Sequence, residues 1–252
     1  MRFLYSVKYQ KKRTFRHLTM VAILLILNSC GGDSNPSDVQ SSGTIDRVAA
    51  KFNLLVPMDA TIEKLAGGFA FTEGPVWDRR NNQLYFSDLS SNAIHTWSDA
   101  EGLKTYLKPV FDGETEHAMV GSNGLNIDSE GRLLLMEHGN RVVSRIEADG
   151  SRTILADDYN GNRLNSPNDS VWHSNGWLYF TDPPYGLAGL EQDPLRELAF
   201  NGIYRLNPES GEVQLLERTQ SRPNGIALSV DERTLYVANS DENDKVWYSY
   251  EV

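Results

Sequence analysis

Four oxygen-bearing side chains recur along the sequence at similar intervals. They are Glu73, Asn123, Asn168 and Asn224, which are separated by 50, 45 and 56 residues, and each opens a short apolar segment. Carboxylate and amide oxygens are the ligands that calcium and other hard cations prefer. Taken singly, an Asn beside Gly or Pro is ordinary turn chemistry, but recurrence in register favours a shared site. If these side chains meet in the fold, they predict a site for a divalent cation.

The other reactive side chains give no competing pattern. The five histidines form neither an HExxH nor an HxH pattern, which argues against a zinc centre of that kind. Gly121-Ser-Asn-Gly124 is one residue too short for the GxSxG turn of a serine hydrolase. Cys30 is the only cysteine, so the folded part contains no disulfide, thiolate zinc site or cysteine nucleophile.

The segments that position the four side chains repeat with a period of about fifty residues. After each opening segment and a polar turn comes a second β-branched and aromatic run, at Leu84–Asp88, Leu133–Glu137, Trp177–Asp182 and Leu235–Asn239. Third strands are expected at Ala93–Trp97, Val142–Ile146, Gly202–Leu206 and Val246–Tyr250, and fourth strands at Lys104–Leu107, Thr153–Ala156 and Val213–Leu216. Four strands per unit predict the blades of an all-β propeller. A two-sheet β-sandwich is the alternative.

Propeller geometry gives the four side chains a common place. The innermost strand of each blade lines the central channel, so equivalent positions in successive repeats fall on a ring around its axis. Because each of the four residues opens the first strand of its repeat, they are expected to converge at one end of the channel.

The composition is that of a globular protein with an acidic surface. The 252 residues are 40% hydrophobic and 23% charged, which excludes a disordered chain. The formal charge is −10, and six basic but no acidic residues lie within residues 1–29, which leaves 18 basic against 34 acidic residues, or −16, in the remainder. Such a surface repels phosphate backbones and attracts cations, so no nucleic-acid partner is expected.

The first 44 residues are expected to direct export and tethering. Residues 1–29 combine a basic start with the apolar run Leu18–Leu27, which is typical of a signal peptide and too short for a permanent membrane helix. Cys30 follows Leu27-Asn-Ser29, which resembles the lipobox of bacterial lipoproteins. We therefore expect a lipidated Cys30, a flexible tether over residues 30–44, and a membrane-anchored protein on the periplasmic side or the cell surface. An ordinary cleaved signal peptide is the alternative.

Five short sequence motifs occur in order along the rest of the chain, at Phe71–Trp77, Glu137–Arg141, Asn165–Asp169, Phe180–Gly186 and Arg222–Ile226. Together they resemble the gluconolactonase family that includes regucalcin, or senescence marker protein, and most closely its bacterial members. The resemblance covers roughly residues 60–252. It implies a six-bladed propeller that holds Ca²⁺, or another divalent cation such as Zn²⁺, Mg²⁺ or Mn²⁺, and that hydrolyses a sugar lactone to the aldonic acid.

The resemblance also implies a role for individual residues. By position, Glu73, Asn168 and Asn224 look like metal ligands, and Asn123, Glu137, His138, Asp182, Tyr185 and Arg222 look like substrate-binding residues. The implied mechanism is metal-assisted ester hydrolysis, in which the cation polarises the lactone carbonyl and a water attacks it.

One departure from the family pattern affects the catalytic base. In relatives, the Asp of a Pro-Asp-Gly motif in a later blade supplies a fourth metal ligand and is often assigned as the general base. No sequence after Asn224 matches that motif. Asp169 and Asp182 are the remaining carboxylates near the ring. The last strand, Val246–Tyr250, is the third of the fourth repeat, so residues 45–252 are expected to form about four blades, the last incomplete, of a C-terminally truncated propeller.

Three functions stay open at this stage. The first is hydrolysis of a sugar lactone. The second keeps the metal site but acts on an aryl ester or a phosphotriester, as the related propellers serum paraoxonase and squid-type fluorophosphatase imply. The third is a binding propeller, or a truncated one, without activity. Because a fold does not settle its substrate, only an assay separates them.

Replacing Cys30 by Ser tests the predicted lipid anchor. The variant is expected to leave the membrane fraction for the soluble fraction, because a hydroxyl cannot replace the thiol in acylation. Membrane and soluble fractions are compared by immunoblot. Unchanged retention in the membrane fraction contradicts the lipoprotein prediction.

Overall fold

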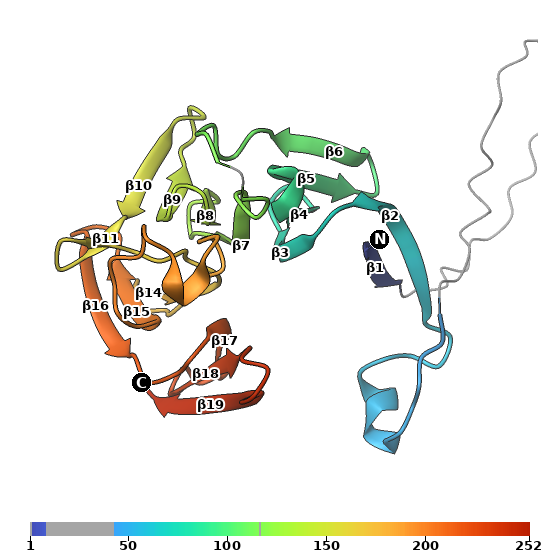
Figure 1. Ribbon diagram of the computed structural model, residues 1–252. Coiled ribbons are helices and arrows are strands. Elements are labelled where there is room, and N and C mark those ends of the chain that lie inside the picture. Colours follow the sequence, from blue (N-terminus) through green and yellow to red (C-terminus); the bar gives the residue numbers. More distant parts are fainter. Residues whose placement is uncertain (1, 9–42, 116) are drawn as a thin grey trace, which may run out of the picture. The chain divides into compact units, whose positions relative to one another are not determined.

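In the computed structural model, four antiparallel sheets follow one another along the chain as the blades of a β-propeller (Figure 1). Each blade pairs its strands in chain order. Blade 1 contains β3 (Thr72–Asp78), β4 (Gln83–Asp88), β5 (Ala93–Ser98) and β6 (Gly102–Leu107), and blade 2 contains β7 (Ser122–Ile127), β8 (Leu133–Glu137), β9 (Val142–Ile146) and β10 (Arg152–Ala156). Blade 3 contains β13 (Ser170–Trp172), β14 (Leu178–Asp182), β15 (Gly202–Asn207) and β16 (Glu212–Glu217), and blade 4 contains β17 (Pro223–Leu228), β18 (Thr234–Asn239) and β19 (Val246–Glu251). The predicted all-β propeller of about four blades, the last with three strands, is confirmed.

The structure describes residues 2–8, 43–115 and 117–252. The predicted apolar signal run Leu18–Leu27 and the predicted lipidation site Cys30 lie outside these residues. The chain divides into two compact units, one from Phe69 to Val252 together with Arg2, and the other within Phe3–Gly68. All four blades belong to the first unit, and residues 45–68, which the sequence assigns to the propeller domain, belong to the second.

The second unit is small. Its strand β2 (Thr61–Phe69) pairs with β1 (Arg2–Lys8), and a 3₁₀ turn, η1, covers Ala50–Leu54. The Arg47 guanidinium donates to the Val56 carbonyl at 2.7 Å and so closes the segment that contains η1. No helix among the described residues has the length and apolar character needed to cross a membrane.

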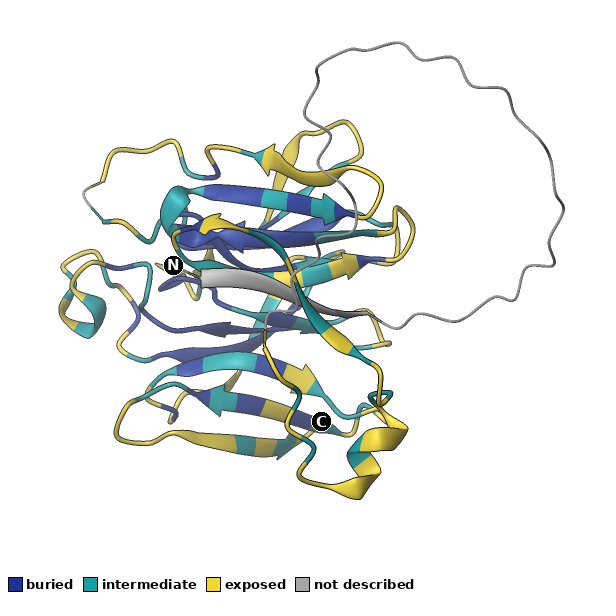
Figure 2. Cartoon of the chain, turned by 90° about the vertical axis from the view of Figure 1, so that its right-hand side faces the viewer, coloured by how far each residue is buried: buried dark blue, intermediate teal, exposed yellow. Residues whose placement is uncertain are grey.

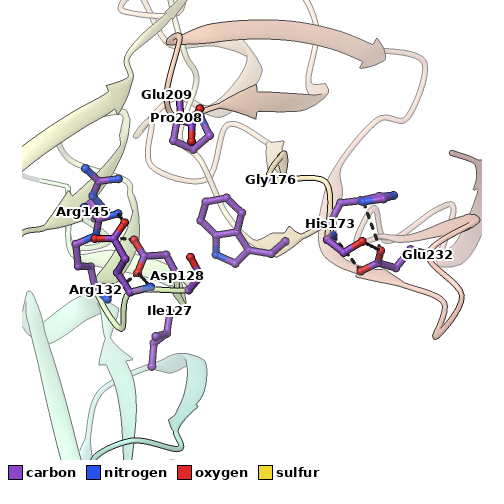
Figure 3. Close-up of a pocket in the computed structure, with 13 residues that line it drawn as sticks. Ile127, Asp128, Arg132, Arg145, His173, Gly176, Pro208, Glu209 and Glu232 are labelled. Carbon is purple, nitrogen blue, oxygen red and sulfur yellow. Dashed lines mark hydrogen bonds and ion pairs between the residues drawn. The ribbon is translucent and has the colours of Figure 1, made fainter.

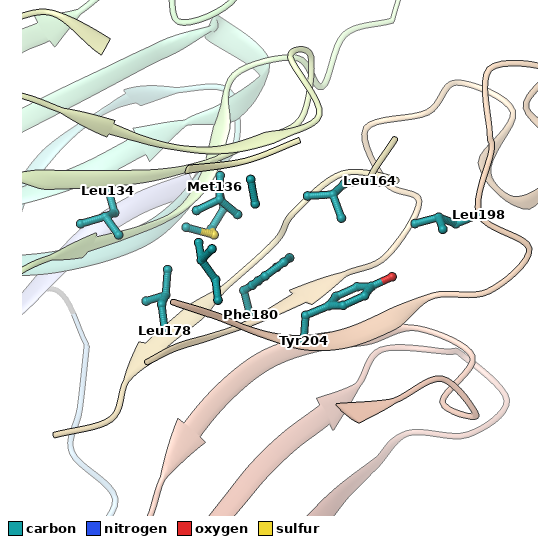
Figure 4. Packing of buried hydrophobic residues seen from close by; sticks show 10 residues of the cluster. Leu134, Met136, Leu164, Leu178, Phe180, Leu198 and Tyr204 are labelled. Atoms are coloured by element: carbon teal, nitrogen blue, oxygen red, sulfur yellow. The ribbon is translucent and has the colours of Figure 1, made fainter. Parts of the chain in front are cut away.

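Apolar side chains fill the spaces between successive blades, because neighbouring residues of a strand point to opposite faces of its sheet. In β8, Leu133 and Leu135 contact blade 1, whereas Leu134 and Met136 contact blade 3. The cluster between blades 2 and 3 contains ten buried residues and includes Phe180 (Figure 4). Figure 2 shows that the buried residues concentrate on the strands and the exposed ones in the turns. The blades therefore share their cores pairwise.

Short irregular segments connect or cap these strands. A two-stranded hairpin, β11 (Asp158–Tyr159) and β12 (Asn162–Arg163), lies between blades 2 and 3, and 3₁₀ turns cover η2 (Leu89–Ser91) and η3 (Leu190–Gln192). The hairpin turn uses Asn160 and Gly161 at φ values of 54° and 79°, the left-handed conformation that a tight hairpin requires.

The first strands of blades 1, 2 and 4 are irregular close to their ring residues. The register shifts between Glu73 and Val76 in β3, and equivalent shifts occur in β7 and β17, between Ser122 and Leu125 and between Pro223 and Ile226. Such bulges leave a residue outside the regular ladder and re-aim its side chain. Asn123 and Asn224 therefore lie inside the irregular part of their strands, and Glu73 lies at its edge, where it pairs with Ser87. Asn168 comes just before β13, whose pairing with β14 is regular.

Glycine lets the innermost strands of neighbouring blades approach closely at these positions. Gly74 has a φ of +52°, and a Cβ added there would lie 2.1 Å from the carbonyl oxygen of Asn123. A Cβ on Gly124 would lie 2.6 Å from the carbonyl oxygen of Asn168. Any larger residue at either position must push two blades apart.

Gly74→Ala tests this close approach, with Gly102→Ala as the matched control. Both glycines have positive φ, but a Cβ on Gly102 would meet nothing within 4 Å. The control is expected to lose about 1 kcal/mol of unfolding free energy from backbone strain, and Gly74→Ala a further ~1–3 kcal/mol from the clash. Urea unfolding measures both, and equal losses would contradict the close approach.

Candidate functional site

The preceding blade holds the backbone carbonyl of each ring residue after the first. The carbonyl of Asn123 accepts a hydrogen bond from the Ser87 hydroxyl at 2.9 Å. The Asn168 carbonyl accepts from the Gly124 amide at 2.6 Å, and the Asn224 carbonyl from the Thr181 hydroxyl at 2.7 Å. The structure therefore places the ring positions side by side in the order of the blades.

The ring side chains differ in what they contact. Asn123 and Asn168 are 6% and 3% exposed, whereas Glu73 and Asn224 are partly exposed. Within the described part of the chain, the side-chain amides of Asn168 and Asn224 have no hydrogen-bond partner. Nor do three His, Cys, Asp or Glu side chains gather there into a metal-binding group. A cation at the ring would therefore depend on amide oxygens and on the Glu73 carboxylate.

Asn123 contacts His138, which β8 and its following turn place beside the ring. The Nδ2 atom of Asn123 lies 3.4 Å from Nε2 of His138. Burial, and to a smaller extent the neighbouring His117, lower the pKa of the fully buried His138 to about 3. His138 is therefore neutral near pH 7, so Nε2 can accept from the Asn123 amide and leave the Asn123 Oδ1 for another partner.

In three of the four blades, the side chain that ends the second strand anchors the loop that enters the first strand, and Asp182 does so in blade 3. Its two carboxylate oxygens accept from the backbone amides of Asn165 and Ser166, each at 2.7 Å. Asp88 and Asn239, which also end second strands, accept in the same way from the amides of the loops that enter β3 and β17.

The surroundings of Asp182 change its acidity. Burial raises the pKa of this carboxyl to about 7, although the two backbone amides and the guanidinium groups of Arg141 and Arg196 act in the opposite direction. With no exposed surface and both oxygens occupied, Asp182 holds the loop that carries Asn168. Its action on a substrate stays a prediction.

Glu137 is likewise fully buried. Its carboxylate accepts from Asn140 and Ser144, and Arg152 donates to it at 3.2 Å. These contacts join β8 to the following turn and to β10 inside blade 2. The predicted contact of Glu137 with a substrate stays a prediction.

Asp169 occupies the position that glycine fills in the other blades. Its Oδ1 accepts from the Ser170 amide at 2.8 Å, and its Oδ2 accepts from the Ile226 amide of blade 4 at 3.1 Å. Burial raises its pKa. Asp169 also lines a cavity of about 580 Å³ together with residues of β17, β18 and Trp247 of β19. Of the two candidate bases, it is the one that reaches an open cavity.

Tyr185 and Arg222 belong to a cluster that joins the loop after β14 to blade 4. The Tyr185 hydroxyl lies 2.6 Å from that of Ser240, and its ring lies 5.6 Å from the Arg222 guanidinium carbon. Arg222 donates two hydrogen bonds of 3.0 Å to Glu191. Its charge is therefore compensated, and the expected contact of Tyr185 and Arg222 with a substrate stays a prediction.

Several residues of this region are absent from the sequence-based assignment. The Nε2 atom of His117 lies 3.1 Å from the Tyr185 carbonyl oxygen, and the Ser166 hydroxyl donates to the Pro183 carbonyl at 2.5 Å. The repeat could have identified Ser87 and Thr181, because each is the next-to-last residue of the second strand of its blade. His117 and Glu191 come from irregular loops, where the repeat gives no register.

The family model of the SMP-30/gluconolactonase/LRE-like region matches residues 71–252, a range that includes every strand of the four blades. The chain belongs to this family. It is 35% identical over 234 residues to a gluconolactonase of Zymomonas mobilis, and the match covers 90% of this chain and 65% of that relative. The family resemblance expected from the five sequence motifs is confirmed.

Solved structures of gluconolactonase-like proteins are also similar to this chain. A gluconolactonase of Xanthomonas campestris matches with a TM-score of 0.66 and 32% identity, over 77% of this chain and 63% of that one. Regucalcin of Agrobacterium tumefaciens, described as a calcium-binding protein, matches with a TM-score of 0.54 and 19% identity, over 74% and 55% of the two chains. The latter likeness shows the fold alone. The chain spans somewhat less than two thirds of the length of its gluconolactonase relative.

His138→Gln tests the neutral, buried imidazole beside the ring. Because the pKa of His138 lies below its unfolded value near 6.5, the unfolded chain takes up a proton that the folded chain does not as the pH falls. The wild type should therefore lose stability relative to the variant between pH 6.5 and 4, by up to about 1.4 kcal/mol per pH unit. Urea unfolding across this range measures the difference, and parallel profiles would show that His138 titrates normally.

Proposed function

We propose that this protein hydrolyses a sugar lactone with the help of a divalent cation bound at the ring. The observation that carries the proposal is the pair of Asn168 and Asn224 amides, which stand at equivalent positions and make no hydrogen bond within the described chain. The family membership and the similarity to a gluconolactonase support the reaction. The calcium-binding description of the regucalcin neighbour supports the cation.

The donor set fits a hard cation. Glu73, Asn168 and Asn224 would hold it through one carboxylate and two amide oxygens, and Ca²⁺ takes such ligands together with water. Because Ca²⁺ takes six to eight oxygen ligands, an ion held by these three residues would also bind water or a substrate oxygen. Because the set contains no sulfur or imidazole, it favours calcium, magnesium or manganese over zinc.

The chemistry divides between the ion and the protein. When bound, a divalent cation stabilises the negative charge that develops on the lactone carbonyl and makes a water more acidic. Asn123 offers Oδ1 as an acceptor for a substrate hydroxyl, because its Nδ2 faces the neutral His138. Asp169, whose pKa is raised by burial, is a stronger proton acceptor than an ordinary carboxylate and is our candidate for the general base.

The charge of the protein favours release of the product. A lactone is neutral, whereas its hydrolysis product is a carboxylate anion. Arg222 is compensated by Glu191, and the chain after residue 29 carries a formal charge of −16, from 18 basic and 34 acidic residues. An acidic surface repels the anion and so favours its departure.

Hydrolysis of D-glucono-1,5-lactone, followed in a pH-indicator buffer above the uncatalysed rate, tests the proposal. Turnover is expected to be abolished by EDTA and restored by excess Ca²⁺ or Mn²⁺. Glu73→Gln and Asn168→Ala should each lower kcat/KM by about 100-fold or more, because each removes a group that positions transition-state charge.

Glu101→Gln is the matched control, because the exposed Glu101 carboxylate pairs with Lys104 and with no other side chain among the described residues. It should turn over the lactone at the wild-type rate. Turnover that is insensitive to chelator, or unchanged in both ring variants, would contradict the metal site. If neither this lactone nor other aldonolactones are hydrolysed, the proposed reaction is wrong.

A further inference from the structure

In blades 1, 2 and 3, the residue just before the third strand reaches the segment that enters the next blade. The Asn92 side chain, before β5, accepts from the Phe111 amide at 2.9 Å, in the segment that leads to β7. The Asn201 side chain, before β15, donates to the Ser221 carbonyl, in the segment that leads to β17. In blade 2 the equivalent residue, before β9, is Arg141.

Arg141 makes this contact with a buried guanidinium. The residue is 4% exposed, and its Nε donates to the carbonyls of Leu164 and Asn165 at 2.8 and 3.1 Å, in the segment that enters β13. Its Nη1 donates to the Leu195 carbonyl at 2.7 Å, in the connection between β14 and β15. A guanidinium suits this role, because it presents five N–H donors in a fixed plane. Arg141 therefore ties two loops of blade 3 to blade 2.

The turn that carries Arg141 does not itself require an arginine. Arg141 has a φ of 58°, a left-handed conformation that is uncommon for a residue with a side chain. Asn92 holds the equivalent place in blade 1 at a φ of 54°, and asparagine and glycine adopt this conformation more readily than arginine does. Such a conformation persists where the surrounding contacts hold it. The contacts of the guanidinium therefore account for the residue at this position.

Asp182 holds the same segment through the opposite kind of group. Its carboxylate accepts from the backbone amides of Asn165 and Ser166, each at 2.7 Å. Arg141 binds the carbonyl of Asn165, so the backbone of this residue is fixed on both sides of its Cα. One segment is therefore held from two neighbouring blades, by a cation on its carbonyls and by a carboxylate on its amides.

The chain between this anchored residue and the ring is stiff. The Pro167 ring fixes its own φ near about −65° and restricts Ser166 to extended backbone. The amide of the next residue, Asn168, donates to the Thr181 carbonyl at 2.9 Å. Little rotational freedom remains between Asn165 and Asn168, so a displacement of the anchored segment also displaces the ring side chain.

We propose that Arg141 is a positioning residue that holds the Asn168 side chain in place for the cation. The inference rests on the proposed function, because Asn168 is one of the three expected ligands. The hydrogen bonds of Arg141 end at backbone carbonyls, so it acts on the ring through the backbone of residues 164–168. Without the guanidinium, buried carbonyls lose their donors and the segment can move. Groups that orient metal ligands typically change metal affinity by roughly 10–100-fold.

Hydrogen exchange of the metal-free full chain tests the positioning directly. Arg141→Lys keeps the charge but loses the planar set of donors, and Arg141→Met also loses the charge. In both variants the backbone amides within residues 164–168 are expected to exchange at least about tenfold faster than in the wild type, with a much smaller change in the strands of blade 1. Unchanged exchange of this segment, or an equal increase in all blades, would overturn the proposal.

A titration with Mn²⁺, followed by the electron paramagnetic resonance signal of the free ion, tests the link to the ring. The Kd for Mn²⁺ is expected to rise about tenfold in Arg141→Lys. Turnover of D-glucono-1,5-lactone at saturating Mn²⁺ should stay within about twofold of the wild type, because all three ligands remain. A loss of stability alone would leave the Kd of the folded chain unchanged, so an unchanged Kd would overturn the link.

The two measurements separate this inference from the proposed function. If the wild type binds no Mn²⁺, the proposed cation site is wrong, and the exchange of residues 164–168 alone decides whether Arg141 positions Asn168. If the wild type binds Mn²⁺ and both Arg141 variants match it in exchange and in Kd, the cation site stands and the role of Arg141 is wrong.

Arg145→Lys is the matched control in the same blade. Arg145 Nη2 lies 2.7 Å from Glu147, and the residue stands near the other end of β9. There it lines a cavity of about 540 Å³ together with Asp128 and Arg132, and no ring residue lines that cavity (Figure 3). The control should keep the wild-type exchange of residues 164–168 and the wild-type Kd for Mn²⁺. Changes as large as those of Arg141→Lys would overturn the proposal, because they would not depend on the contacts of Arg141.

Discussion

The backbone carbonyls at the start of the first strands are the contacts on which the site depends. Those of Asn123, Asn168 and Asn224 each accept a hydrogen bond from the preceding blade. A buried carbonyl without a partner costs about 1–3 kcal/mol, so these bonds fix each blade to its neighbour at the channel. Glycine at positions 74 and 124 permits the approach, because no side chain separates the strands. Blade packing therefore determines where the ring side chains point. It positions Asn168 and Asn224 through their backbones, without hydrogen bonds to their side-chain amides within the described chain.

Other buried polar residues stabilise the scaffold around this ring. Asp88, Asp182 and Asn239 occupy the same position at the end of a second strand and satisfy backbone amides of the loop that enters their blade. Asp169 joins blade 3 to blade 4 through the Ile226 amide. A rigid support of this kind keeps the ligands in place when substrate and product exchange. It also explains why polar side chains are common at one end of the strands without all of them acting on a substrate.

The sequence predicts the strands well because their signals are local. Alternating apolar residues and turn residues such as Asn81-Asn82 and Asn175-Gly176 mark each strand and its end. The repeat also predicts the register of the ring, since one-residue shifts would move its side chains to another face. Local signals do not show what a buried carboxylate contacts. Asp182 and Glu137 read as pocket residues in the sequence, but their partners come from loops and strands whose positions only the folded chain determines. For the same reason His117 and Glu191, in loops outside the repeat, escaped prediction.

The most direct test of the proposed ring is an X-ray structure of the full chain crystallised with Mn²⁺ and recorded at the manganese absorption edge. We expect one anomalous peak at the channel, bound by side-chain oxygens of Glu73, Asn168 and Asn224. A channel without such a peak at saturating Mn²⁺, or a peak bound only by residues outside the ring, would contradict it.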